Sequence, residues 1–146
     1  MSFDVGTVLD RAAAYLTPPS RWQQFDFRDW QTGECCAAGA IAYTAVPWDV
    51  HGDPLDPSTG NAELAALSRE AATFFAEYLV DYQGANRATF GDDEAQPGEL
   101  DVIETIAGYN DDPARTQTEV VAALHAAAAE WRERAAAREL RTGAAA

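Results

Sequence analysis

The chain has 146 residues, a formal net charge of −14, and a hydrophobic content of 47%. This length suits one domain with a single core, and this hydrophobic content argues against intrinsic disorder. Because nucleic acids and anionic membranes are bound through clustered cations, such an acidic chain argues against direct binding to either. The charge is compatible with a basic protein partner, although an ordinary solvated surface is the simpler explanation.

The expected compartment is the cytoplasm. No apolar run approaches the ~20 residues of a membrane-spanning helix, and the first residues lack the basic segment of a signal peptide. The two cysteines, Cys35 and Cys36, are adjacent, and neighbouring cysteines rarely form a disulfide bond without strain. A disulfide scaffold is therefore not expected, which agrees with a reducing compartment.

Helical periodicity runs through most of the chain and predicts an all-α fold, a compact single-domain bundle of about five helices. The first helix is expected over residues 5–16, because the proline pair at 18–19 cannot continue it. In residues 22–30, Phe25 and Phe27 alternate with polar residues and predict either a short strand or an extended aromatic segment. The apolar stripe of the first helix is Val5, Val8, Leu9, Ala12 and Leu16.

A second helix is expected over residues 32–46, with Thr32 or Gly33 near its N-cap and Glu34 in its first turn. One face of this helix carries mostly small residues, which allow another backbone to come close. That face consists of Cys36, Gly39, Ala40 and Tyr43. The segment 47–61 is rich in Pro, Gly and Asp and predicts a long loop.

A third helix is expected to begin with Asn61 as its N-cap. A second loop is expected over residues 83–98, followed by a short fourth helix near residues 100–106. The inner face of the third helix is Leu64, Leu67, Ala71, Phe74, Phe75 and Tyr78.

The fifth helix is expected to start at Thr116, and its buried stripe ends at Trp131 because the following apolar face is too sparse to bury. We therefore expect a single helical domain over residues 1–141 and a disordered tail over residues 142–146.

Residues 109–119, termed the polar corner, join the fourth and fifth helices. Thr116 and Glu119 are spaced as a capping box, in which the Thr hydroxyl accepts from the Glu backbone N–H and the Glu carboxylate accepts from the Thr backbone N–H. A Thr cap of this kind contributes about 1 kcal/mol to its helix. The spacing predicts that the corner starts the last helix.

The other polar residues of the corner also have expected structural roles. Asn110 suits the left-handed turn that ends a helix. The Arg115 guanidinium is placed to bridge the carboxylate of Asp111 or Asp112 to a helix-end carbonyl. The first hypothesis is therefore a mechanical joint between two helices, and the alternative is a ligand site built from the same residues.

The corner also carries a resemblance to a known family. The pattern Y-N-D-D-P-x-R-T-x-x-E-V-x-x-x-L, from Tyr109 to Leu124, resembles an uncharacterised family of small actinobacterial and phage proteins. The segment 36–40 is similar to the Cys-x-x-Gly-Ala segment of that family. The resemblance implies an architecture and a set of positions rather than an activity. These positions are Cys36, Gly39, Ala40, Tyr109, Asn110, Asp111, Arg115, Thr116 and Glu119.

An enzymatic alternative uses Cys36 as a nucleophile. Near a helix N-terminus, the unpaired N–H groups and the helix dipole favour a thiolate. The general base would be His51, oriented by Asp49 or Asp53, with a pocket joining Cys36 to residues 110–115. A buried packing thiol is the competing explanation.

No metal and no cofactor are expected. The cysteines and histidines lack the spacing of paired metal ligands, and the acidic loops do not follow the twelve-residue calcium loop. The sequence has no lysine with which a phosphate-binding loop would hold a nucleotide.

The leading hypothesis is a non-enzymatic module that binds another protein, including a basic one, or a second copy of itself. Trp30 and Trp48 lie in or beside non-helical segments and, if exposed together, form an aromatic patch with an acidic rim. A second alternative is a phage-type acidic inhibitor that mimics nucleic acid. The candidate binding residues are Trp30, Trp48, Tyr109, Asn110, Asp111, Arg115 and Glu119.

Overall fold

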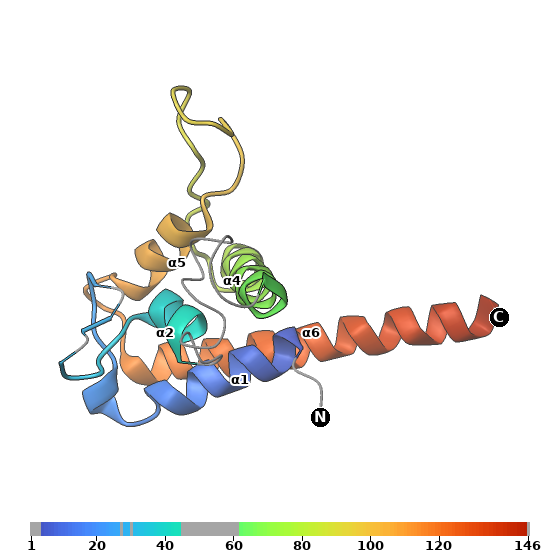
Figure 1. Ribbon diagram of the computed structural model, residues 1–146, viewed down its shortest axis with the longest axis horizontal. Helices are drawn as coiled ribbons and strands as arrows, with labels where there is room; N and C mark the ends of the chain where they lie inside the picture. The colour runs from blue at the N-terminus through green and yellow to red at the C-terminus, as the bar shows by residue number, and fades with distance from the viewer. Residues whose placement is uncertain (1–3, 27, 30, 45–61, 146) are drawn as a thin grey trace.

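The computed structural model describes residues 4–26, 28–29, 31–44 and 62–145. Every regular element in these ranges is a helix, so the prediction of an all-α single domain is confirmed (Figure 1). The elements are α1 (Val5–Leu16), the 3-10 helix η1 (Pro19–Arg21), α2 (Ala37–Tyr43), α4 (Ala62–Tyr82), α5 (Val102–Asn110) and α6 (Gln117–Ala145).

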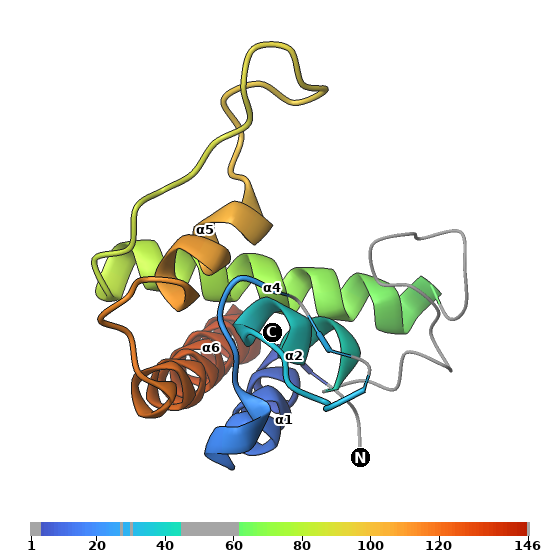
Figure 2. The same cartoon turned by 90° about the vertical axis from the view of Figure 1, so that its left-hand side faces the viewer.

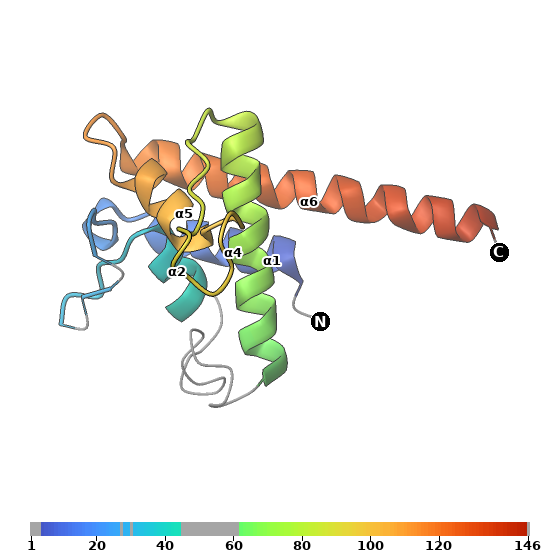
Figure 3. The same ribbon diagram turned by 90° about the horizontal axis from the view of Figure 1, so that it is seen from above.

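Helix α1 forms where its apolar stripe was predicted. Asp4 caps it, because a carboxylate oxygen of Asp4 accepts a hydrogen bond of 2.7 Å from the Thr7 backbone N–H. The whole predicted stripe of α1 is buried. The helix runs alongside α6 and also contacts α2 and α4 (Figures 1 and 3). It therefore lies at the centre of the core.

Helix α4 crosses over α1 and α6, and α5 packs against α4 (Figure 3). The short helix α2 contacts α1, α4 and α5 (Figure 2). Phe75 and Leu79 of α4 are fully buried, and α2 contributes Ile41 to the same core. Because α2 has mainly alanine and glycine on its buried face, the three neighbouring helices approach its backbone closely.

Helix α6 is packed against the core only in its first half. Residues 132–143 are all at least partly exposed, as the sparse apolar face predicted, and this half of α6 projects away from the other helices (Figure 1). The helix continues past Arg141 to Ala145, into the segment that we expected to be a disordered tail. None of the helices in the described ranges has the length and apolar character needed to cross a membrane.

The expected start of the second helix is wrong. Helix α2 begins at Ala37 rather than near Thr32, and Glu34 lies before the helix instead of in its first turn. The preceding residues pair instead with the end of η1 and the residues after it. The Cys35 N–H donates to the Arg21 carbonyl at 2.8 Å, and the Gln23 N–H donates to the Cys35 carbonyl at 3.1 Å. Isolated bridges join Trp22 and Arg28 to Cys35, whereas Phe25 between them has a φ of 70°, so the described part of the aromatic segment is not a continuous strand.

Residues 83–101 form an arm that rises away from the helices (Figures 1 and 2). Its two sides meet through an isolated antiparallel bridge between Thr89 and Leu100. The Thr105 hydroxyl of α5 fixes the base of the arm by accepting from the Ala88 N–H at 3.1 Å. The loop predicted over residues 83–98 is therefore confirmed.

Candidate functional site

The side chain of Asn110 lies at the centre of the hydrogen bonds of the polar corner. Its side chain is fully buried, at 0% exposure, and its carbonyl oxygen accepts from the Trp22 indole N–H at 2.8 Å and from the Ala37 backbone N–H at 3.0 Å. Its amide nitrogen donates to the Gln23 carbonyl at 3.1 Å and to the Asp111 carboxylate at 3.0 Å. All four hydrogen-bonding positions of the amide are therefore used.

The chain after η1 is held against the end of α5 by further contacts. The Gln24 side-chain amide donates to the Asn110 carbonyl at 3.0 Å and to the Asp112 carbonyl at 2.8 Å. The Phe25 N–H donates to the Asp111 carboxylate at 2.8 Å. The corner thus joins residues 22–25 to the C-terminal end of α5, although these segments lie more than 80 positions apart.

The predicted role of Asn110 as a left-handed helix terminator is wrong. Asn110 is the last residue of α5, and the C-cap is Asp111, with a φ of −94° and a ψ of 1°. The Asn110 amide is directed into the fold instead, where it supplies the first N–H of α2 with an acceptor. Helix α2 therefore depends on α5 for its start.

Arg115 crosses the end of α5. Its Nε donates to the Tyr109 carbonyl at 3.0 Å, as the expected bond to a helix-end carbonyl requires, and its guanidinium carbon lies 3.7 Å from the centre of the Tyr109 ring. The carboxylate partner is Glu119, at 3.1 Å, rather than Asp111 or Asp112. One oxygen of Asp111 instead accepts from the Asn110 amide and the Phe25 N–H, and Asp112 accepts from the Ala114 N–H.

The predicted capping box is confirmed. The Glu119 N–H donates to the Thr116 hydroxyl at 3.2 Å, and the Thr116 N–H donates to the Glu119 carboxylate at 3.1 Å. The hydrogen bond from the Thr116 hydroxyl lowers the pKa of Glu119, and the bond from Arg115 acts in the same direction. Gln117 adds a link that we had not predicted, because its amide donates to the Leu16 carbonyl at 2.6 Å at the end of α1.

The polar corner is consequently a joint, in the sense that its side chains bond to the main chain around them. Tyr109 and Asn110 are buried, and the guanidinium of Arg115 is held on both sides. The contacts tie α5 to α2 and to α6, and they tie α6 to α1. This arrangement favours the mechanical hypothesis over an open ligand site at these residues.

The Cys36 thiol is placed to cap α2 rather than to react. Its sulfur accepts from the Gly39 N–H at 3.4 Å, and the residue is only 6% exposed. Burial raises the pKa of Cys36, more than the hydrogen bond from Gly39 lowers it. Burial also raises the pKa of Cys35 to about 12. Both shifts disfavour the thiolate, which is the form in which a cysteine acts as a nucleophile.

One surface recess adjoins the joint, and we term it the acidic recess. It has a volume of about 340 Å³ and lies between α5 and the chain around Phe25. Three carboxylate residues and no cation are among the described residues that line it. Its lining residues are Phe25, Asp26, Cys36, Ala38, Ile103, Glu104, Ala107, Gly108 and Asp111.

The recess brings together only part of the predicted site. Cys36 and Asp111 both line it, as the pocket hypothesis required, whereas Arg115 and Glu119 lie outside its lining. Trp30, Trp48 and His51 lie outside the described residues. In the described ranges, no three His, Cys, Asp or Glu side chains are grouped so that they would hold a metal ion.

Phe25 is the residue of this region that sequence reasoning missed. Its φ is 70°, in the left-handed region that disfavours a phenylalanine, and its side chain is 77% exposed. A sequence signal existed, because Gln23 and Gln24 interrupt the aromatic run immediately before it and have the amides that dock this segment. The partners of Gln24 are Asn110 and Asp112, 86 and 88 positions away, so the local pattern did not reveal the turn.

Comparison with known proteins identifies the family of this chain but no activity. A model for a family of unknown function, DUF6197, matches residues 2–130. No curated protein and no solved structure matches the chain. The function must therefore be inferred from the geometry of the site.

Proposed function

The chain belongs to this family of unknown function, DUF6197, and we propose that it is a non-enzymatic protein-interaction domain that docks its partner at the acidic recess. The proposal rests on the exposure and the backbone conformation of Phe25. Its side chain is 77% exposed, and its φ is 70°. A large aromatic side chain at the edge of a recess is a common anchor for a protein partner.

The conformation of Phe25 opposes folding. A left-handed backbone costs roughly 1–2 kcal/mol for a residue with a Cβ atom, and the exposed ring recovers little of this through burial. This backbone conformation is stabilised by the hydrogen bond that the Phe25 N–H donates to Asp111 and by the two hydrogen bonds that the Gln24 side chain donates. Strained residues that the surrounding structure holds in place are concentrated at functional sites. Binding explains why this position has phenylalanine instead of glycine.

The charge of the recess defines the partner. Asp26 and Glu104 are exposed at the recess, and Asp111 of the polar corner also lines it. An apolar side chain of the partner would pack on Phe25 and Ile103, while an arginine or lysine would meet the carboxylates. The partner is therefore a protein segment that combines an apolar residue with a basic one.

The state of the cysteines supports a non-enzymatic role. Cys36 lines the recess, but its thiol is bonded to the start of α2 and has a raised pKa. The only histidine in the described residues, His125, lies on α6 and bonds to Asp10 of α1 at 2.7 Å. No general base for Cys36 is therefore provided by a histidine of the described ranges.

Photo-crosslinking tests the proposal. A photoreactive phenylalanine analogue replaces Phe25 in one variant and Leu140 in the other, and both are irradiated in a lysate of the host. Leu140 is a matched control because it is 76% exposed on the projecting half of α6. We expect a discrete crosslinked protein from position 25 that unlabelled wild type competes away, and that weakens as salt rises.

Two further variants separate docking from folding. Asp26→Asn with Glu104→Gln should weaken the crosslink at position 25 without changing the melting temperature by more than a few degrees, because both carboxylates are exposed. Identical crosslinked proteins from positions 25 and 140, or a crosslink that the charge variant leaves unchanged, would contradict the proposal.

A further inference from the structure

Two segments of the chain extend from the helical body, and they carry opposite charge. One is the projecting half of α6, residues 132–145, and the other is the arm, residues 83–101 (Figure 1). The projecting half has four arginines and two glutamates, whereas the arm has five acidic residues and one arginine. Four of the ten basic residues of this acidic chain therefore lie near the end of one helix.

The arginines of the projecting half form a basic face. Arg134, Arg138 and Arg141 lie four and then three positions apart, so they share one side of α6. That side is turned toward α4, because Arg134 and Arg138 line a recess together with Phe74. Arg134 is paired with a glutamate of its own helix. Arg138 and Arg141 are exposed and form no ion pair with any residue that the structure describes.

The arm presents a surface of the opposite charge. A recess of about 410 Å³, which we term the arm recess, lies between the arm and helices α4 and α5. Glu77, Glu99 and Asp101 line it, and its described lining includes no arginine or histidine. The carboxylates of Asp92 and Asp93, farther along the arm, are exposed and unpaired within the described ranges, as is that of Glu99. Its apolar residues include Phe90, Leu100 and Val102.

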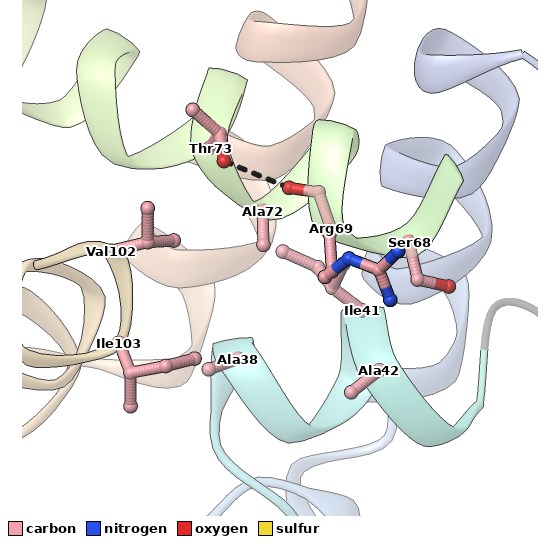
Figure 4. Close-up of a pocket in the computed structure, with 9 residues that line it drawn as sticks. All are labelled: Ala38, Ile41, Ala42, Ser68, Arg69, Ala72, Thr73, Val102 and Ile103. Atoms are coloured by element: carbon pink, nitrogen blue, oxygen red, sulfur yellow. Dashed lines mark hydrogen bonds between the residues drawn. The ribbon is translucent and has the colours of Figure 1, made fainter. Parts of the chain in front are cut away.

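The inner edge of the arm recess is formed by α4 and the start of α5. Figure 4 shows Thr73 and Val102, which line this edge, on the two neighbouring helices. The Thr73 hydroxyl donates to the Arg69 carbonyl at 2.9 Å and is thus occupied within α4. The charge of the arm recess therefore comes from its carboxylates. Apart from Ile103, which lines both, its residues differ from those of the acidic recess.

We propose that two copies of the chain form a two-fold dimer in which the projecting half of α6 of each copy lies against the arm of the other. Arg138 and Arg141 pair there with the exposed carboxylates of the arm. Leu140, whose side chain is 76% exposed, packs into the arm recess, where it loses contact with water. The projecting half extends away from its own arm, so the contact is made between copies (Figure 1). A two-fold axis makes the same contact twice.

This dimer interface is separate from the docking surface at Phe25 and does not depend on the partner proposed there. A photoreactive residue at position 140 would link two copies of the chain. The protein linked at position 25 would be a different one. The two proposals can therefore fail independently.

Exchange of charge between two variants tests the pairing. Arg138→Glu with Arg141→Glu makes the projecting half acidic, and Asp92→Arg with Asp93→Arg and Glu99→Arg makes the arm basic. In sedimentation equilibrium at low salt, the mass of the wild type should rise with concentration from 15.7 kDa toward twice that value. Each variant alone should dimerise at least about tenfold more weakly, because like charges then meet at both contacts. An equal mixture of the two variants should restore the dimer, because each altered segment meets a segment of opposite charge.

Two further variants complete the test. Asp26→Arg with Asp112→Arg is the control, because both carboxylates are exposed and lie outside the arm and the projecting half, and it should dimerise as the wild type does. Leu140→Asp should weaken the dimer at least about tenfold, and it serves if a charge variant fails to fold. A wild type that stays at 15.7 kDa at every concentration, a mixture no better than its parts, or a control that also loses the dimer would overturn the proposal.

Discussion

Replacement of Asn110 with alanine tests the joint most severely. The change removes four hydrogen bonds from a side chain with 0% exposure. Two donors, the Trp22 indole N–H and the Ala37 backbone N–H, then lose their acceptor. Each buried donor without a partner costs roughly 1–3 kcal/mol, so we expect Asn110→Ala to lower the free energy of unfolding by about 3–4 kcal/mol.

That loss is large for a single domain, whose total stability is typically about 5–15 kcal/mol. Urea denaturation followed by tryptophan fluorescence measures it, and the melting temperature should fall by about 10 °C. Asp112→Ala is the matched control, because Asp112 is an exposed corner residue whose carboxylate accepts one N–H, and its loss should stay within about 1 kcal/mol. If Asn110→Ala lowers the free energy of unfolding by less than about 1 kcal/mol, the role of the polar corner as a joint between helices is contradicted.

Asn110→Asp refines the same test. The aspartate keeps an oxygen for Trp22 and Ala37 but places a second carboxylate oxygen beside Asp111, where the amide now donates at 3.0 Å. Burial and the neighbouring negative charge raise the pKa of such an aspartate. The variant should therefore be destabilised at pH 7 and should recover stability relative to wild type as pH falls and the carboxyl protonates. Equal destabilisation at pH 4 and pH 7 would contradict this role.

Further predictions concern the cap, the thiol, one ion pair and the strained turn. Thr116→Ala should destabilise the domain by about 1 kcal/mol in denaturation, and a neutral result would contradict the capping box. At pH 8, Cys36 should react with iodoacetamide far more slowly in the folded than in the unfolded chain, because burial raises its pKa; equal rates would contradict that burial. Burial acts to raise the pKa of Asp10, but hydrogen bonds from His125 and Arg132 outweigh it and leave that pKa lowered. The stability difference between wild type and Asp10→Asn should therefore be present at neutral pH and disappear as pH falls from about 4 toward 2, and a difference that persists at pH 2 would count against the ion pair. Phe25→Gly should leave stability unchanged or slightly raised while it weakens docking, and clear destabilisation would show that the ring supports the fold.

Local sequence patterns predicted the parts of the fold that local interactions determine. The stripe of α1 follows from helical spacing, and the capping box follows from residues three positions apart. The sparse face beyond Trp131 correctly predicted where α6 leaves the core. In each case the relevant partners are close in sequence or share one helix face.

The parts that failed depend on distant partners. Asn110 was expected to end a helix locally, but its amide bonds to Trp22, which lies 88 positions earlier in the chain. The start of α2 was placed too early because Thr32 and Glu34 are good capping residues, while in the structure the chain there pairs with the segment after η1. The candidate site changed for the same reason. Its strained Phe25 depends on Asp111 across the fold.

The most direct measurement of the joint is native-state hydrogen exchange at the Ala37 amide. This N–H lies at the first residue of α2, where an ordinary helix lacks an internal acceptor and exchanges readily. Because it donates to the buried Asn110 side chain at 3.0 Å, we predict protection close to that of the global unfolding free energy. Exchange at the rate of a frayed helix end in the folded wild type would contradict the account.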